Sequence, residues 1–213
     1  MTPRLVLASS SPRRAELLRQ IGLSFEVAAP QVDETTDLPD HPKERVFEIA
    51  RRKAQAVAQT VEEGWIVAAD TIVVQGGEPI GKPTDAEHAR RILRRLAGSR
   101  HKVLTAVVVV RMPEGEYRAD VAQTGVLFTP LSDAQIAEYV ATGEPLDKAG
   151  AYGIQGLAGA YVRDVHGDPS NVRGLPLALT VALLAEAGYP LPGSLKPEPA
   201  DALAQAEPPK EAP

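Results

Sequence analysis

The sequence predicts an α/β fold, because uninterrupted apolar segments alternate with helical patterns along most of its 213 residues. Residues 4–8 and 65–70 are largely apolar and continuous, as buried strands are, and residues 101–111 form a dense valine-rich strand. Residues 15–21 and 42–63 place apolar side chains at helical spacing. The chain is long enough for one large domain or two small lobes.

The start of the first helix predicts an anion site. Residues 9–11 are three serines that offer hydroxyl donors, and Pro12 suits a first helical turn. Arg13 and Arg14 add planar guanidinium groups that match phosphate oxygens. A helix start also presents unpaired N–H groups and the positive end of its dipole, which most often bind phosphate. The alternative is an ordinary capped surface helix with solvated arginines.

A strand at residues 25–28 and a loop at residues 30–42, with Asp33 and Glu34, lead into the long second helix. Lys53 falls on the apolar stripe of that helix. A lysine that faces inward needs a reason. Either its ammonium group extends past the edge of the core, or it reaches an anion at the end of the sheet.

The strand at residues 65–70 ends on Asp70, and we expect the backbone to continue extended from Thr71 to Val74. Ligands of α/β sheets gather at the carboxyl ends of strands. Capping of a turn is the alternative role for this carboxylate. The segment from Gly76 to Lys82 has the spacing of a phosphate-binding P-loop, but Pro83 stands where that motif needs Ser or Thr. We therefore expect a hairpin there, and Lys82 remains a candidate phosphate ligand as a point charge.

The rest of the chain completes the fold and ends in a different composition. The expected elements are a helix at 85–97 capped by Thr84, antiparallel strands at 101–111 and 117–128, a helix from Ser132 to Thr142, a strand at 160–165 and a helix at 177–187. Residues 190–213 are dense in Pro, Ala and Glu. They bury too little surface to offset their ordering entropy, so we predict a domain over residues 1–189 and a disordered tail over 190–213.

Composition excludes several classes of function. The net charge of −5 argues against a general nucleic-acid binder. The absence of cysteine rules out disulfides, thiolate metal sites and a thiol nucleophile. The chain has no apolar run long enough to span a membrane, and its N-terminus is too polar for a signal peptide, so we expect a cytoplasmic protein without a membrane partner.

Charged residues at the ends of predicted elements suggest phosphoryl chemistry. The cations are Arg13, Arg14, Lys53, Lys82 and Lys148, and the carboxylates are Asp33, Glu34, Asp70 and Asp147. Carboxylates hold a hard divalent cation, and lysine and arginine neutralise the remaining phosphate charge. The hypothesis requires that these distant segments converge on one site.

The same segments resemble the Maf family of nucleoside triphosphate pyrophosphatases. The matching motifs, in family order, are LASSSPRRAELL, VDET, ARRKA, AADTIV, GKP, DKAGAYGIQG and NVRGLPL. The resemblance implies an elongated mixed sheet with flanking helices and two lobes around a nucleotide cleft, similar to the inosine-triphosphate pyrophosphatase group. It further implies hydrolysis between the α and β phosphates, a divalent cation such as Mg²⁺ or Mn²⁺, and a homodimer.

The resemblance also implies roles for individual residues. Asp70 is expected to accept the proton of the attacking water, and Glu34 to hold the metal, together with Asp70; tight metal binding by Asp70 would weaken its role as a base. Binding of the triphosphate falls to Ser9, Arg13, Arg14, Lys53 and Lys82. Residues Arg13, Thr71 and Gln155 match the family branch specific for dTTP and UTP, and an amide at position 155 offers both a donor and an acceptor to a uracil edge. Gln155 could instead bond its own glycine-rich backbone.

Two other functions stay open from the sequence. One is a purine-directed pyrophosphatase that acts on inosine or 7-methylguanosine triphosphates. The other is a non-catalytic regulator of cell division that binds nucleotide or a partner protein.

Overall fold

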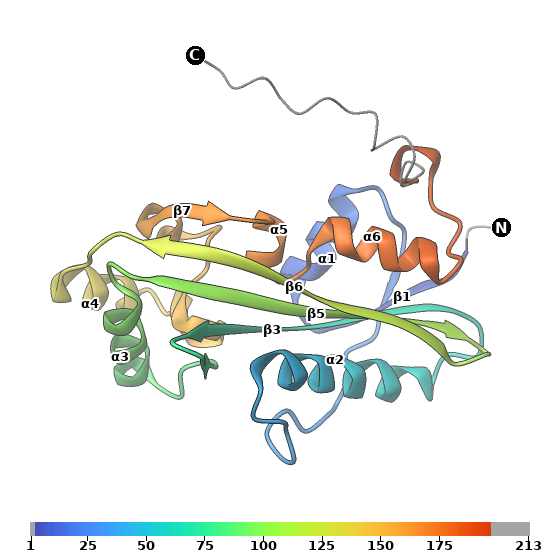
Figure 1. The fold of residues 1–213 in the computed structure, drawn as a ribbon, viewed down its shortest axis with the longest axis horizontal. Coiled ribbons are helices and arrows are strands. Elements are labelled where there is room, and N and C mark those ends of the chain that lie inside the picture. Colours follow the sequence, from blue (N-terminus) through green and yellow to red (C-terminus); the bar gives the residue numbers. More distant parts are fainter. Residues whose placement is uncertain (1–2, 197–213) are drawn as a thin grey trace.

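A computed structural model describes residues 3–196, and Figure 1 shows an elongated molecule built on one sheet. Within these residues seven strands pair in the order β2-β1-β3-β5-β6-β7, and β4 pairs with β3. The strands are β1 (Leu5–Ala8), β2 (Glu26–Val27), β3 (Gly64–Gln75), β4 (Glu78–Ile80), β5 (Arg100–Met112), β6 (Glu116–Phe128) and β7 (Val162–His166). This arrangement confirms the predicted mixed α/β sheet.

Helices flank the sheet along its whole length. The α-helices are α1 (Pro12–Gln20), α2 (Pro42–Ala58), α3 (Ala86–Leu96), α4 (Asp133–Ala141), α5 (Pro169–Val172) and α6 (Leu177–Glu186). Four short 3₁₀ turns, η1 (Glu144–Asp147), η2 (Ala149–Ala151), η3 (Leu157–Tyr161) and η4 (Gly193–Leu195), lie in the second half of the described chain.

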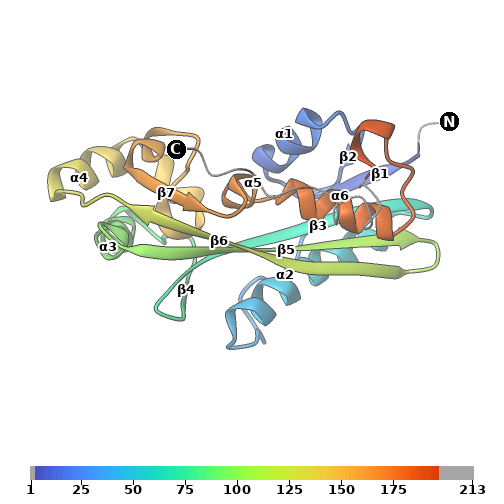
Figure 2. The same ribbon diagram turned by 45° about the horizontal axis from the view of Figure 1, so that its top comes forward.

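Three long strands join the two ends of the molecule. Strands β3, β5 and β6 are antiparallel neighbours of 12 to 13 residues, and β5 supplies an unbroken valine run from Val107 to Val110. Branched side chains of this kind pack well on a pleated surface. Figures 1 and 2 show these strands running from one group of helices to the other.

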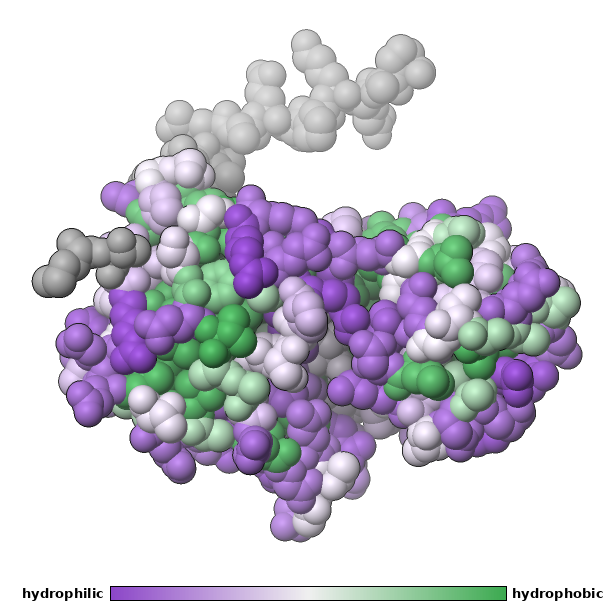
Figure 3. Space-filling model, turned by 180° about the vertical axis from the view of Figure 1, so that it is seen from behind, coloured by the Kyte–Doolittle hydropathy of each residue, from purple (hydrophilic) through white to green (hydrophobic). Residues whose placement is uncertain are grey.

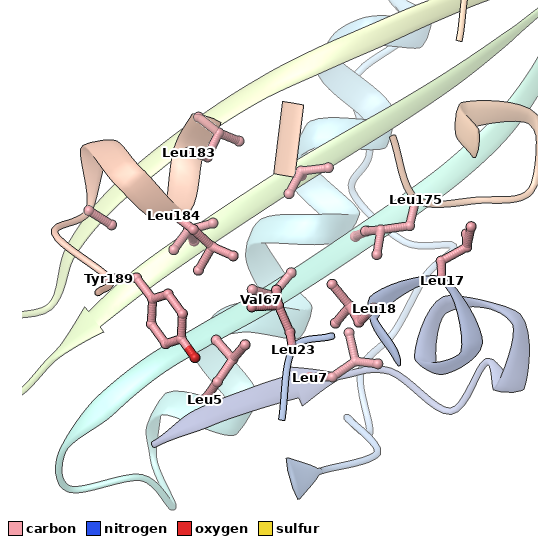
Figure 4. Close-up of a cluster of buried hydrophobic side chains, with 14 of the residues drawn as sticks. Leu5, Leu7, Leu17, Leu18, Leu23, Val67, Leu175, Leu183, Leu184 and Tyr189 are labelled. Carbon is pink, nitrogen blue, oxygen red and sulfur yellow. The ribbon is translucent and has the colours of Figure 1, made fainter. Parts of the chain in front are cut away.

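The first end of the molecule is a three-layer sandwich. Helices α1 and α6 cover one face of the sheet and α2 covers the other, as Figure 2 shows. Between the sheet and the α1–α6 layer lies the cluster drawn in Figure 4, where Leu7 of β1 and Val67 of β3 meet Leu18 of α1 and Leu184 of α6. On the opposite face, α2 buries Val46, Ala50 and Val57 of its predicted apolar stripe.

The second end has its own core. Its core joins α3 and α4 to residues 147–160, called here the glycine-rich segment, and includes Phe128 of β6, Tyr139 of α4 and Tyr152 of that segment. The long strands therefore connect this core to the two clusters that lie on opposite faces of the sheet at the first end.

The parallel pairing of β1 with β3 places Asp70 at the edge of the first core. Ala8, the last residue of β1, pairs with Ala68, so β1 ends two residues before Asp70. Asp70 itself lies within β3, so the expected strand end at Asp70 is wrong, whereas the extended backbone expected from Thr71 to Val74 is confirmed as part of the same strand. The reason is that β5 continues to pair with β3 through Asp70 to Val74, after β1 has turned away.

Two other expectations of the sequence are corrected, and one helix was missed. The long helix ends at Ala58 rather than residue 63, because the N–H and hydroxyl of Thr60 both donate to the Val57 carbonyl at 2.9 Å. The cap of α3 is Asp85, not Thr84, since its carboxylate accepts the N–H of His88 at 2.7 Å. Helix α5 was not predicted at all.

Two regions bear on other predictions. Gly76 and Gly77 form the turn of the β3–β4 hairpin, so the P-loop alternative is excluded because no helix follows them. At the start of the predicted tail, Leu191 is buried in the cluster under α1 and α6, and Leu195 packs against that cluster. The rest of that tail lies outside the described residues.

Within residues 3–196, no helix has the length and apolar character needed to cross a membrane.

Candidate functional site

A cleft of about 1010 Å³ lies between the two ends of the molecule. Figure 3 shows hydrophilic side chains gathered across the middle of one face, where the surface is hollowed. The lining includes all nine site residues that the sequence predicts, which are Ser9, Arg13, Arg14, Glu34, Lys53, Asp70, Thr71, Lys82 and Gln155. Segments more than 140 residues apart therefore meet around one cavity, as the hypothesis requires.

Lys53 joins two carboxylates on the wall of this cleft. Its Nζ lies 2.7 Å from Oδ1 of Asp70 and 3.0 Å from Oε1 of Glu34. The side chains of Lys53 and Asp70 are only 9% and 10% exposed, whereas Glu34 is 43% exposed. The sequence left two explanations for Lys53, which were extension past the edge of the core and contact with an anion. The structure shows contact with two carboxylates. A buried charge is costly unless it is paired, and here each supports the other.

The loop that carries Glu34 is held from α2. The guanidinium of Arg52 donates to the carbonyls of Asp33 at 3.2 Å, Thr36 at 2.8 Å and Asp37 at 2.9 Å. Hydrogen bonds from Thr36 and Thr35 hold the pKa of Asp33 well below its ordinary value. Its carboxylate accepts the N–H and the hydroxyl of Thr35, both at 2.7 Å, and the N–H of Thr36 at 3.2 Å. Asp33, a candidate for chemistry, thus shapes the loop and does not line the cleft.

Arg14 is fixed by three contacts where α1 begins. Its Nε donates to the Gly174 carbonyl at 2.7 Å, and its two terminal nitrogens donate to the hydroxyls of Ser9 at 3.3 Å and Thr71 at 3.1 Å. Ser9 Oγ also accepts the N–H of Ser11 at 3.1 Å. Burial lowers the pKa of the Arg14 guanidinium, and the nearby Asp70 carboxylate opposes that shift. The predicted anion site therefore has a positioned cation next to the start of α1.

Arg13 points across the cleft. Its guanidinium lies 3.5 Å from the Asp147 carboxylate, which Lys148 Nζ also contacts at 2.6 Å. These contacts join α1 at one end of the molecule to η1 at the other. The candidates Asp147 and Lys148 both line the cleft, but they pair with each other there.

Lys82 and Gln155 come from the second end. The carbonyl of Gly81, next to Lys82, accepts the N–H of Gly150 at 3.1 Å, which ties this turn to the glycine-rich segment. Gln155 is exposed, and its amide makes no hydrogen bond to any residue between 3 and 196. The alternative that Gln155 bonds its own glycine-rich backbone is therefore not observed.

The polar groups buried behind the glycine-rich segment are neutral. A ring nitrogen of His101 lies 2.8 Å from the Tyr152 hydroxyl, and burial lowers the pKa of His101 to about 4. Burial likewise raises the pKa of the Tyr152 phenol above its ordinary value. Both side chains are therefore uncharged at neutral pH. Tyr152 also lines the cleft, so this neutral pair lies directly behind the cleft wall.

The acidic groups of the cleft suit a divalent cation that keeps its own water. Two carboxylates, Glu34 and Asp70, converge on one point at Lys53, and no group of three or more potential ligands exists within residues 3–196. Mg²⁺ typically binds one or two carboxylates together with substrate phosphates and several waters, so this donor set fits it.

Sequence reasoning missed several residues of this cleft. Arg45 lies two helical turns before Lys53 on α2 and also lines the cavity, as does Glu144 of η1. The i, i+4, i+8 spacing of Arg45, Ile49 and Lys53 would have placed Arg45 on the same face. No local signal marks Glu144, because its contacts with Tyr139 and Leu157 depend on how α4, η1 and the following loop fold back on one another.

Comparison with known proteins places the chain among close relatives. The model of a family described as Maf-like protein matches residues 4–187. A protein of Anaeromyxobacter dehalogenans strain 2CP-1, named dTTP/UTP pyrophosphatase, is 55% identical over 194 residues, which cover 90% of this chain and 98% of that protein. A Symbiobacterium thermophilum protein of the same name is 52% identical over 188 residues, 88% of this chain and 96% of its own. Among solved structures, the Staphylococcus aureus Ham1 protein is 17% identical with a TM-score of 0.43, covering 59% of this chain and 72% of that one, a likeness too distant to add to the assignment.

Proposed function

Since this chain belongs to the family of Maf-like proteins, we propose that it hydrolyses dTTP and UTP to the nucleoside monophosphate and pyrophosphate. Its relatives named dTTP/UTP pyrophosphatase share about half of their residues with it over most of their length. The observation that carries the proposal is the convergence of Lys53, Asp70 and Glu34 in a cleft that Arg14 also lines.

In this proposal Asp70 accepts the proton of the attacking water. Its carboxylate is held within a long strand, and among the described residues only Lys53 donates to it, at 2.7 Å. A base must be held within hydrogen-bond reach of its water, and a buried strand provides that rigidity. The water oxygen forms a bond to the α-phosphorus, while the bond from that phosphorus to the bridging oxygen breaks. The bridging oxygen keeps the electron pair and leaves with pyrophosphate.

The cationic side chains bind the triphosphate and stabilise the charge that grows on it. Arg14 is already held by Ser9, Thr71 and Gly174, so its guanidinium needs little reorganisation to meet a phosphate. Lys53, Lys82 and Arg13 line the same cavity. Fixed positive groups of this kind usually make the largest electrostatic contribution to catalysis.

A divalent cation completes the charge balance. Glu34 and Asp70 are the residues that would hold it, and when bound it supplies charge neutralisation and polarisation at the phosphate oxygens. Asp70 has one carboxylate oxygen engaged by Lys53, which leaves the other available to a water.

Thr71, Arg13 and Gln155 are the residues proposed to select the base. The Gln155 amide lines the cleft without a bond to residues 3–196, so both its donor and its acceptor are available to a uracil or thymine edge. The two oxygens and the N–H of that edge complement an amide. A cationic 7-methylguanine lacks this match.

A panel of nucleoside triphosphates tests the proposal. Purified protein is incubated with dTTP, UTP, CTP, ITP and 7-methyl-GTP, with Mg²⁺, with Mn²⁺ and with chelator, and the released pyrophosphate and orthophosphate are measured. Metal-dependent release of pyrophosphate from dTTP and UTP is the expected result. Preference for a purine would overturn the assigned specificity, and a lack of turnover with every nucleotide would favour a regulatory protein.

Two further expectations accompany this function. A cytoplasmic location is tested by fractionation of the producing cells. The homodimer is tested by light scattering of the purified chain, which separates a mass near 22.7 kDa from twice that value.

A further inference from the structure

The five residues from Gly153 to Leu157 form a loop with Gln155 at its centre and an anchor at each end. The N–H of Gly153 donates to the Tyr139 hydroxyl oxygen at 3.2 Å. The N–H of Leu157 donates to Oε2 of Glu144, also at 3.2 Å. The two anchors are bonded to each other, because the Tyr139 hydroxyl donates to Oε1 of Glu144 at 2.9 Å.

We propose that Glu144, acting with Tyr139, is a positioning residue that sets the substrate specificity of the cleft. It holds both ends of the loop in place, and the Gln155 amide is thereby presented to the base of the nucleotide. This inference rests on the proposed function, since it concerns which base that same site accepts.

The glycines of the loop are what allow the Glu144 carboxylate to reach it. A Cβ on Gly156 would overlap the Glu144 carboxylate, and one on Gly153 would come within 2.7 Å of the Lys148 side chain and 3.2 Å of Glu144 Oε1. A side chain at either position would push the loop away from its anchors. The loop and the carboxylate therefore fit one another by close backbone approach.

The anchor is itself rigid. Tyr139 is 1% exposed on α4, where it packs edge to face with Tyr161 at a centroid distance of 5.6 Å. The carbonyl of Glu144 accepts Lys148 Nζ at 2.6 Å, which fixes the backbone of η1 as well. In contrast, Gln155 is exposed and has no bond of its own to residues 3–196, so its place depends on the two ends of its loop.

The chemistry of this anchor requires a carboxylate. Glu144 accepts two hydrogen bonds, one on each oxygen, from a phenol and from a backbone N–H. An amide has only one acceptor atom, so Glu144→Gln retains the bond from Leu157 or the bond from Tyr139 but not both as they are now. Glu144→Ala removes both, and Tyr139→Phe removes one together with the acceptor of the Gly153 N–H.

The test compares UTP with CTP, which differ only at the edge of the base that Gln155 is proposed to read. The ratio of kcat/KM for UTP over CTP is measured for the wild type, Glu144→Ala, Glu144→Gln and Tyr139→Phe. We expect the ratio to fall about tenfold in Glu144→Ala and in Tyr139→Phe, the scale of one lost hydrogen bond, and by less in Glu144→Gln. The control is Glu138→Gln, which changes an exposed carboxylate next to Tyr139 on α4 and should leave the UTP-to-CTP ratio unchanged.

A second measurement reports on the loop without nucleotide. Hydrogen–deuterium exchange of the peptide that covers residues 153–157 should be faster in Glu144→Ala and Tyr139→Phe than in the wild type and in Glu138→Gln. Loss of folded protein lowers the rates for UTP and CTP by the same factor. An unchanged UTP-to-CTP ratio, or unchanged exchange of this peptide, would therefore overturn the role of Glu144. Failure of the wild type to release pyrophosphate from UTP would instead overturn the proposed function. The exchange measurement would still show whether Glu144 and Tyr139 hold the loop in place.

Discussion

The two ends of the cleft bury polar groups of opposite kinds. At the end built by β1, α1 and α2, Lys53 and Asp70 form a buried ion pair, with 7% of each whole residue exposed. At the end built by α3, α4 and the glycine-rich segment, His101 and Asn171 are buried and neutral, with 3% and 0% exposure. A triphosphate needs charge to bind and react, whereas a neutral base is recognised by hydrogen bonds and shape. In the proposed function the buried ion pair meets the triphosphate, together with Lys82 of the other end, and Gln155 of the neutral end meets the base, together with Arg13 and Thr71.

The physical cost of burial differs between the two ends. Asp70 and Lys53 neutralise each other at 2.7 Å, which offsets the loss of hydration of both charges. His101 has no such partner, and burial therefore favours its uncharged form. His101 is neutral because it is buried without a counter-charge, whereas Lys53 and Asp70 are buried as an ion pair.

The largest expected effect is the loss of turnover in Asp70→Asn. The amide keeps the shape of the side chain but cannot accept the proton of water, so we expect kcat for dTTP to fall by roughly 10²–10⁴-fold. Binding of dTTP, measured by calorimetry, should persist because the cations of the cleft are unchanged. Asp40→Asn, which alters an exposed carboxylate, is the control and should retain the wild-type rate. A wild-type rate in Asp70→Asn would show that Asp70 is not the base. The Lys53–Asp70 ion pair would then have no role in catalysis.

The ionic end was the easier half to predict from sequence. Its residues stand in short motifs at the ends of strands and helices, and a charged group next to an apolar segment is visible without a structure. Lys53 was marked by its place on an apolar helix face, and the structure shows the contact that explains it. The error at Asp70 arose because the sequence cannot reveal that β5 continues to pair beyond the end of β1.

Most of the functional contacts at the neutral end could not be predicted from the sequence. Glu144, Tyr139 and His101 are ordinary residues in their local context, and their meaning depends on contacts such as the 2.8 Å approach of His101 to Tyr152 across 51 positions. The proline-rich composition after residue 189 likewise concealed that Leu191 packs on the first core. Local pattern identifies charge near an edge, but long-range packing decides which neutral groups come together.

The second prediction concerns stability and addresses the neutral end. Burial lowers the pKa of His101 to about 4 from an ordinary value of 6.5. The unfolded chain therefore binds more protons than the folded one between these values, and the free energy of unfolding falls as the pH is lowered from 6.5 to 4. The full loss is about 3 kcal/mol. Urea denaturation followed by circular dichroism at pH 7 and pH 4.5 measures most of it.

Other groups leave this window nearly clear. Hydrogen bonds from Arg51 and Arg52 lower the pKa of Glu48 to about 2, and partial burial opposes that shift. Protonation of Glu48 therefore lowers the free energy of unfolding only below the ordinary pKa of 4.5. His101→Phe should therefore show a flat stability between pH 6.5 and 4.5, while the control His41→Phe, at an exposed position just before α2, keeps the wild-type slope. An equal slope in wild type and His101→Phe would mean that the neutral end is not kept neutral by burial.

The smallest effect is a change of preference in Gln155→Glu. A carboxylate accepts a hydrogen bond from the uracil N–H but repels the neighbouring carbonyl oxygen, whereas the amide satisfies both. We expect kcat/KM for UTP to fall by about tenfold, the scale of one unsatisfied polar contact, and that for the cationic 7-methyl-GTP to rise relative to it.

Steady-state kinetics with both nucleotides gives the ratio for Gln155→Glu, and the control variant Gln59→Glu adds the same charge at an exposed position outside the cleft lining. The outcome also discriminates between the two ends. If the added charge acts only on the base, the ratio changes while the dependence on divalent metal stays as in the wild type. If it instead weakens metal dependence for both nucleotides equally, then the charge acts at the triphosphate, and the division of the cleft into an ionic and a neutral end is wrong.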